Sequence, residues 1–268
     1  MGDVIEPWMY PEYVPIVRKT IKRRYEMIPY TYSLALESHL TASPPQRWTG
    51  WGYESDPEVW THKLLTDGET QYWFGDSLLI GGCYQPGENV AKMYLPKHGQ
   101  DDPGYLNLNA PYQYLDAGQW VEIESTWETS IPVLAKVGTA VPTGKDVQTV
   151  APGDRANAAR LPADDLRSLE IFPPKGDSAG RTFTYKWFED DGISAKDNIS
   201  EFSISYSSTA SEVRVAVKHE SGSYKPVWKK LNVVLPYDDK RNVVSSGGQA
   251  LEVELGSSEH RRAFQIDM

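Results

Sequence analysis

The chain has 268 residues, a formal net charge of −10 at pH 7 and one cysteine. Its acidic balance argues against nucleic-acid binding, which needs a clustered basic surface. One cysteine excludes an internal disulfide and a cysteine-based zinc site, and no apolar run reaches the roughly 18 residues that span a bilayer. With 9 Trp, 16 Tyr and 6 Phe, the chain has enough large apolar groups to fold over most of its length, despite a mean hydropathy of −0.52.

A pair of helices is predicted near the N-terminus. Apolar residues recur between positions 14 and 28 at spacings of three, four, four and three, which is typical of an amphipathic helix of about four turns. Pro29 bends or ends this helix, and a second one is predicted from residue 30 to about 41. Neighbouring sequence offers the pair no complete partner, so we expect another layer to cover them. The stripe on the first helix consists of Val14, Val17, Ile21, Tyr25 and Ile28.

Residues 71–87, QYWFGDSLLIGGCYQPG, have the pattern of a buried strand between turns. The apolar run Leu78, Leu79 and Ile80 stands between a Gly-Asp turn and a Gly-Gly break. Short strands separated by Gly, Pro and Asp turns follow, which is the spacing of an antiparallel sandwich. These strands are predicted at 89–95, 112–115, 120–123, 131–137 and 139–142.

A linker poor in large apolar residues is predicted around residues 143–165, and a second β unit follows it. Seven short strands in about a hundred residues again favour a small sandwich. They are predicted at 166–172, 182–188, 201–206, 212–218, 229–235, 250–255 and 263–266.

Five separated segments also carry motifs in a fixed order. They are Glu6-Pro7-Trp8 with Arg24-Tyr25 and Pro29-Tyr30-x-Tyr32-Ser33, then residues 71–87, Tyr94-Leu95-Pro96, Ile131-Pro132-Val133 with Gly138-Thr139 and Val141-Pro142, and Glu189-Asp190-Asp191-Gly192. In this order they resemble the C-terminal portion of glycoside hydrolase family 31, the α-glucosidases and α-xylosidases. Two departures are Trp48 after Arg47, where the family has proline, and Gly81-Gly82-Cys83, where the family has Ala-Pro-Val.

The resemblance implies that the nucleophilic and acid/base Asp of the family lie upstream, on loops of a (β/α)8 barrel. We therefore expect no catalytic residue, metal or cofactor in this chain. Trp8 and Tyr10 are its only candidate substrate-binding residues, at the rim of the cleft. For each of them, packing against the end of the barrel is the simpler interpretation.

Acidic doublets are the other residues with catalytic chemistry, because a retaining glycosidase uses two carboxyl groups. Asp101-Asp102, Asp164-Asp165, Asp190-Asp191 and Asp238-Asp239 all fall in predicted turns, where Asp bonds to local backbone, and Asp190-Asp191-Gly192 is interpreted as a hairpin turn. The five histidines lack metal-ligand spacing. An aromatic cluster could stack on sugars, although core packing is favoured; it contains Trp48, Trp51, Tyr53 and Trp60.

The sequence therefore predicts a mainly β protein: two antiparallel β-sandwich domains preceded by two or three helices that would complete a (β/α)8 barrel. The expected domains are the barrel end (1–87), a proximal sandwich (88–145), a linker (146–165) and a distal sandwich (166–268). The implied function is structural support within a retaining α-glycosidase acting on α-glucosides or α-xylosides. The implied partners are the upstream barrel and, in the intact enzyme, a carbohydrate.

The alternative function is a non-catalytic carbohydrate-binding or interaction module, which would present coplanar exposed aromatic residues on one sheet. A complete enzyme with another carboxylate pair is a third hypothesis. The first residues lack the basic and apolar segments of a signal peptide, so none is expected in this chain, and the sequence leaves its cellular location open.

Overall fold

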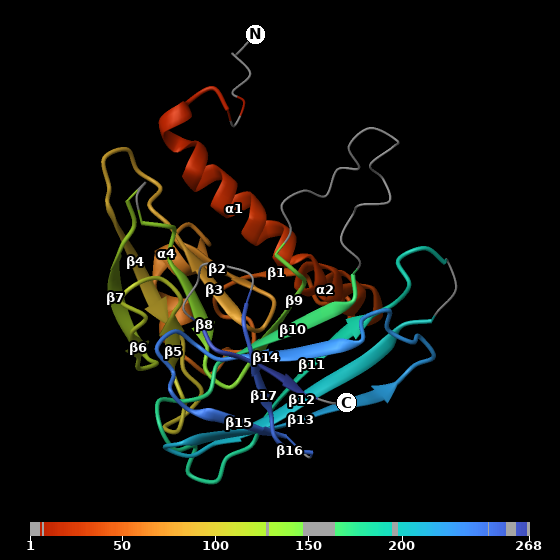
Figure 1. The fold of residues 1–268 in the computed structure, drawn as a ribbon. Coiled ribbons are helices and arrows are strands. Elements are labelled where there is room, and N and C mark those ends of the chain that lie inside the picture. The colour runs from red at the N-terminus through yellow and green to blue at the C-terminus, as the bar shows by residue number, and fades with distance from the viewer. Residues whose placement is uncertain are drawn as a thin grey trace.

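The computed structural model describes residues 6, 8–126, 129–146, 164–194, 198–245, 247–255 and 261–266. Within these residues the chain is mainly β, with a pair of longer helices at the N-terminal side (Figure 1), which confirms the predicted fold class. None of the described helices is long and apolar enough to cross a membrane. The helices are η1 Pro11–Tyr13, α1 Val14–Glu26, α2 Ile28–Thr41, α3 Glu58–Thr61 and α4 Lys63–Thr66.

The two longer helices follow directly from their sequence signals. Pro15 and Pro29 each lie in the first turn of a helix, where a missing backbone N–H costs nothing. α2 ends where Ala42 adopts a left-handed conformation with φ of 62°. The short helices α3 and α4 were not predicted, because four-residue helices leave no periodic signal.

The proximal β region consists of a six-stranded antiparallel sheet and a two-stranded one. β3 is central in the larger sheet, pairing with β2 on one side and β8 on the other. The boundaries of the larger sheet, in spatial order, are β1 Gln46–Arg47, β2 Gln71–Phe74, β3 Leu78–Gly81, β8 Val133–Lys136, β5 Tyr105–Asn107 and β6 Tyr114–Leu115. The smaller sheet pairs β4 Val90–Leu95 with β7 Gln119–Glu124.

Both faces of β3 are covered, which explains its uninterrupted apolar run. Leu78 and Ile80 face α2, and Leu79 packs on the opposite face with Met93 of β4. The next position must be small, because a Cβ at Gly81 would lie 2.4 Å from the Met93 sulfur. Gly81, one of the residues that depart from the Ala-Pro-Val pattern, therefore lies where β4 approaches β3 closely.

The distal β region is a sandwich of two five-stranded sheets around one apolar core. Each sheet contains one parallel pair, β10 with β14 and β13 with β15, and the other pairs are antiparallel. One sheet has the order β17 Leu251–Val253, β18 Ala263–Ile266, β14 Lys230–Val234, β10 Leu166–Ile171 and β9 Ala140–Thr143. The other has the order β11 Phe183–Glu189, β12 Ser200–Ser208, β13 Glu212–Ser221, β15 Asn242–Ser245 and β16 Gly248–Gln249.

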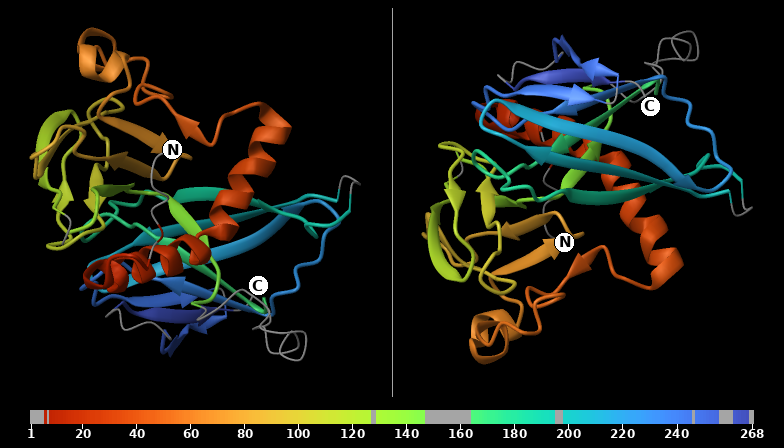
Figure 2. Two further views of the ribbon diagram at one scale, coloured as in Figure 1. Left: turned by 90° about the horizontal axis from the view of Figure 1, so that it is seen from above. Right: turned by 90° about the horizontal axis from the view of Figure 1, so that it is seen from below.

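The sheets extend across the expected domain boundaries. The division into domains itself stays a prediction. β2 and β3 share a sheet with strands beyond residue 88, and β9 pairs with β10 across the expected linker, most of which lies outside the described residues. Figure 2 shows the proximal sheets (orange to yellow-green) beside the distal ones (green to blue). α2 packs at their junction, because its side chains share an apolar cluster with β3 and with Phe172.

Candidate functional site

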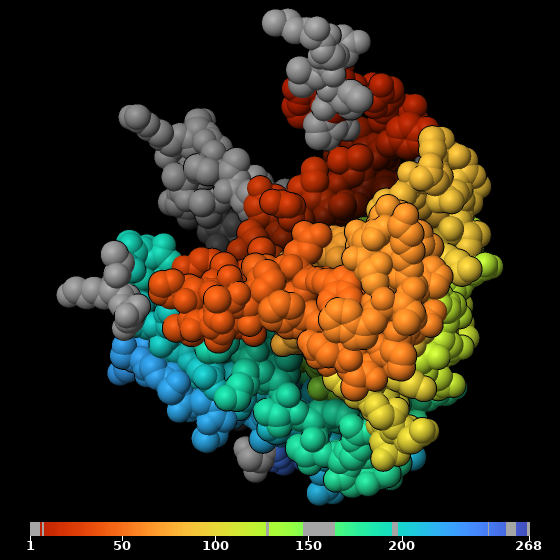
Figure 3. Space-filling model, turned by 180° about the vertical axis from the view of Figure 1, so that it is seen from behind, coloured from red at the N-terminus to blue at the C-terminus, as the bar shows by residue number. Residues whose placement is uncertain are grey.

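The outward face of α1 is the most unusual surface of the molecule. None of the 13 residues of α1 is buried, and its stripe is 42% exposed at Ile21 and 37% exposed at Tyr25. Ile28, the last residue of the predicted stripe, is 50% exposed and begins α2. α1 projects from the edge of the sheets toward the N-terminus in Figures 1 and 3. A contiguous apolar stripe left in solvent is typical of an interaction surface. Within the described residues, the layer expected over both helices covers α2 but leaves α1 without a buried residue.

Trp8 and Tyr10 continue this surface beyond the first turn of α1. Their side chains are 69% and 49% exposed, respectively. The Tyr10 ring makes an edge contact with Tyr13, with the ring centroids 6.3 Å apart. Both residues therefore stand free of the sheets, and their assignment to a substrate cleft stays a prediction.

The last turn of α1 is held by charges rather than by apolar packing. Arg23 donates two hydrogen bonds, of 2.7 and 2.9 Å, to the Glu170 carboxylate on β10, and Arg261 donates another of 2.9 Å. Burial would raise the pKa of Glu170, but the two positive charges outweigh it and hold the pKa well below the ordinary 4.5. The Gly144 amide also donates to the Glu26 carbonyl at 2.7 Å. These contacts tie the last turn of the helix to the distal sheet.

α2 connects both β regions through the Pro-Tyr-x-Tyr-Ser motif. The Tyr30 hydroxyl donates to the Phe74 carbonyl at 2.5 Å, and its ring is fully buried beside β3. Ser33 accepts a hydrogen bond of 2.9 Å from the amide of Phe188 on β11. Tyr32 donates to Asp190 at 2.8 Å. The motif therefore joins the proximal sheet to the distal sandwich.

The Glu-Asp-Asp-Gly motif has a role in the distal core. Glu189 is buried and accepts hydrogen bonds from Arg167 at 2.8 Å, Trp228 at 2.8 Å and Trp187 at 3.2 Å. These donors satisfy a carboxylate that would otherwise be costly to bury. The motif opens the connection between β11 and β12, which are consecutive antiparallel neighbours, so the expected hairpin is confirmed.

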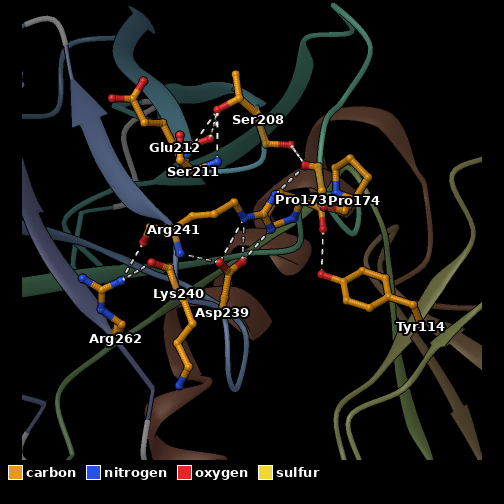
Figure 4. Close-up of polar contacts among 12 residues, drawn as sticks. Tyr114, Pro173, Pro174, Ser208, Ser211, Glu212, Asp239, Lys240, Arg241 and Arg262 are labelled. Carbon is orange, nitrogen blue, oxygen red and sulfur yellow. Dashed lines mark hydrogen bonds and ion pairs between the residues drawn. The ribbon is translucent and has the colours of Figure 1, made fainter.

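A second polar joint links the two β regions at the opposite side (Figure 4). The Arg241 guanidinium donates to the carbonyls of Pro174 and Gly176 at 3.0 and 2.8 Å, and it pairs with Asp239 at 2.5 Å. From the proximal sheet, the Tyr114 hydroxyl donates to the Pro173 carbonyl at 2.9 Å. The segment after β10 is thereby bound from both regions.

At least one residue of each acidic doublet bonds to a residue two to four positions away. Asp102 accepts from the amides of His98 and Gly104, at 2.7 and 2.9 Å. Asp164 pairs with Arg167, and Asp191 caps the amides that follow it. Across the described ranges, no three His, Cys, Asp or Glu side chains lie close enough to hold a metal ion.

The aromatic cluster divides into packed and exposed members. Tyr53 is buried, and Trp48 packs against Trp60 with ring centroids 4.7 Å apart. Trp51 and Trp60 remain 42% and 55% exposed. Among the described residues, no large aromatic side chain that is similarly exposed lies on a strand, so the sheet-borne platform of the alternative function is absent from this part of the chain.

The charged contacts of Arg23, Glu170 and Arg261 were missed from the sequence. Glu170, which stands between Leu169 and Ile171 in β10, was the available signal, because an acidic residue inside a buried strand needs a partner. The local sequence does not indicate which residue pairs with Glu170, because Arg23 lies 147 positions away.

Comparison with known proteins places most of the proximal region in one family. Residues 42–141 match the model of the glycosyl hydrolase family 31 C-terminal domain. Alpha-glucosidase 2 of Bacillus thermoamyloliquefaciens is 28% identical over 84% of this chain. The alpha-xylosidase of Saccharolobus solfataricus is 27% identical over 70% of it. The chain spans 25% and 22% of the lengths of these two relatives.

Solved structures share the fold over nearly the whole chain. A GH31 dextranase of Flavobacterium johnsoniae superposes with a TM-score of 0.74 at 21% identity, covering 99% of this chain and 33% of the dextranase chain. The GH31 alpha-xylosidase of Xanthomonas citri has a TM-score of 0.62 at 20% identity, with 98% of this chain and 25% of that one covered. Helices and both β regions therefore occur together in larger glycoside hydrolases.

Proposed function

Because this chain is a C-terminal part of a glycoside hydrolase family 31 protein, we propose that it supports the barrel of a retaining α-glycosidase that hydrolyses α-glucosides or α-xylosides. The catalytic Asp pair lies outside this chain, and the outward face of α1 packs against the barrel. The single observation that carries the proposal is a regular 13-residue helix without one buried residue. Such a helix gains its stability from a partner that covers its stripe.

The size of the exposed stripe supports a permanent contact. Burying one large aliphatic or aromatic side chain contributes about 1.5–3 kcal/mol, so Ile21, Tyr25 and Ile28 together favour a stable interface. Trp8 and Tyr10 extend the same surface toward the barrel, where they would stand at the rim of the cleft. The relatives named above, an α-glucosidase and an α-xylosidase, support these two substrate classes.

A chimera tests the proposal. We expect this chain, in place of the corresponding C-terminal quarter of Bacillus alpha-glucosidase 2, to restore a soluble enzyme that cleaves nitrophenyl α-glucoside. Ile21→Lys should abolish soluble activity, because it places a charge in the contact. Thr20→Lys, one residue away and off the stripe, should not. Equal activity of the two variants would contradict the proposed contact.

The location of the catalytic pair is tested with the 268-residue chain alone. We expect no turnover of nitrophenyl α-glucoside or nitrophenyl α-xyloside. Turnover would overturn the proposed division of roles and support a complete enzyme in this chain.

A further inference from the structure

A small cavity of about 120 Å³ lies away from α1, between the turn at residues 51–53, the β2–β3 turn and the end of β8. Aromatic rings form much of its wall: Tyr53 stacks with Trp73 at 5.5 Å and with His98 at 4.0 Å between centroids. Trp51 stands at the rim and is 42% exposed. The cavity is smaller than the roughly 300 Å³ of the smallest drug-sized sites, so it suits a single small ring rather than a longer ligand.

Charged groups complete the lining. Arg47 is fixed by Glu37 at 2.9 Å and by the Pro44 carbonyl at 2.8 Å, and it pairs with Asp76. The Asp76 side chain remains 60% exposed, so its carboxylate can accept further hydrogen bonds. The Arg47 guanidinium also lies 5.8 Å from the centre of the Trp51 ring, which orients that ring at the rim.

Lys136 is the least satisfied group in the cavity. Its ammonium lies 4.8 Å from the centre of the Tyr53 ring, and it makes no hydrogen bond or ion pair with any residue in the described ranges. Burial lowers the pKa of this amine. A half-buried ammonium with three unused donors gains from a ligand that supplies oxygen acceptors.

We propose that this cavity binds one pyranose ring of a neutral saccharide, with Trp51 stacking on the sugar, Lys136 donating to its hydroxyls and Asp76 accepting from them. Hydroxyl groups both donate and accept, so a sugar satisfies the two charges together. A simple anion would be repelled by the Asp76 carboxylate, and a simple cation would be repelled by Lys136 and Arg47. The site is separate from the α1 surface. Only the choice of glucoside or xyloside as ligand rests on the proposed function.

Direct binding tests the proposal. Methyl α-glucoside and methyl α-xyloside are titrated into the 268-residue chain, with saturation-transfer NMR for detection and calorimetry for Kd. We expect at least one glycoside to bind, and Trp51→Ala to weaken it about tenfold or more, which corresponds to about 1.4 kcal/mol. Lys136→Met should weaken it similarly. Trp60→Ala is the matched control, because Trp60 is more exposed than Trp51 but lies outside the cavity.

Each result decides the question. Absence of binding by either glycoside, unchanged affinity in Trp51→Ala, or equal loss in Trp60→Ala would overturn the proposal, as would displacement of the sugar by acetate. Trp51 is partly exposed, so its variant remains informative even where Lys136→Met fails to fold. Binding requires no barrel and no hydrolysis. A failed chimera together with intact binding would therefore refute the proposed function and leave the sugar site standing.

Discussion

α1 and α2 are consecutive helices of nearly equal length with opposite environments. α2 has 14 residues and buries Tyr30, Ser33, Leu34 and Leu36 between the two β regions. α1 has 13 residues, buries none, and is held by hydrogen bonds and ion pairs at its last turn. The difference shows that periodicity identifies a helix without saying where its partner is. It also distinguishes α2, which is packed within this chain, from α1, which presents apolar side chains to another surface.

The charged anchor of α1 gives the largest expected effect. Glu170→Gln leaves Arg23 and Arg261 facing a neutral group, and breaking such a buried pair costs about 3–5 kcal/mol. Urea unfolding should show this loss. Glu252→Gln is the control, because its partner Arg262 is held on the surface, with 52% of the Glu252 side chain exposed, and such pairs contribute at most about 1 kcal/mol. A similar cost for both variants would show that the anchor is weak.

Leu34→Ala tests the buried helix. Removing a buried leucine side chain costs about 2–5 kcal/mol, so the urea midpoint should fall. Leu40→Ala on the same helix should have little effect, because Leu40 is exposed. If both substitutions were neutral, α2 would not be the joint between the two β regions.

Lowering the pH tests whether Glu170 is charged in the folded protein. Its pKa is depressed in the folded protein, so its stabilising effect is complete above the ordinary value of 4.5 and is lost as the pH falls below that value toward the lower folded pKa. The difference in unfolding free energy between the wild type and Glu170→Gln should therefore shrink below about pH 4.5. A difference that stays constant down to pH 3 would argue against a charged Glu170.

The stripe of α1 gives the smallest expected change in the isolated chain. Ile21→Ala should alter the unfolding free energy by no more than about 0.5 kcal/mol, because this side chain is 42% exposed. Thermal unfolding of the wild type and of Ile21→Ala measures this difference. A loss of 2 kcal/mol or more would mean that α1 is covered in the free chain, for example by a second copy.

The helices and most strands could be predicted because their signals are local. The three- and four-residue spacing from position 14 located α1, which ends at Glu26, and alternation with turn residues located β4, β7 and most distal strands. Strands β15 and β16 were not predicted. Strand β5 was missed because Tyr105–Asn107 is only three residues long. The order of the strands was not predictable, since pairs such as β10 with β14 are parallel and distant in sequence.

The polar contacts could be predicted only in part. The Glu-Asp-Asp-Gly motif was visible, but the three donors to Glu189 come from separate positions along the chain. Lys136 was overlooked because a lysine in a strand usually points to solvent. The period of two places it on the same face as Leu134, which packs in the proximal core. Its position at the end of the strand lets the ammonium reach the cavity.

Strand β9 has a consequence for how such proteins can be recombined. It follows the proximal strands in sequence, yet it hydrogen-bonds to β10 in the distal sheet, while Val141 packs beside Tyr30 of α2. Dividing the chain after residue 145 would strip β10 of its neighbour and expose a row of unpaired backbone groups. The distal sandwich is therefore not a transplantable unit on its own. Exchange between related enzymes should keep β9 with it, together with α2, which packs against both β regions.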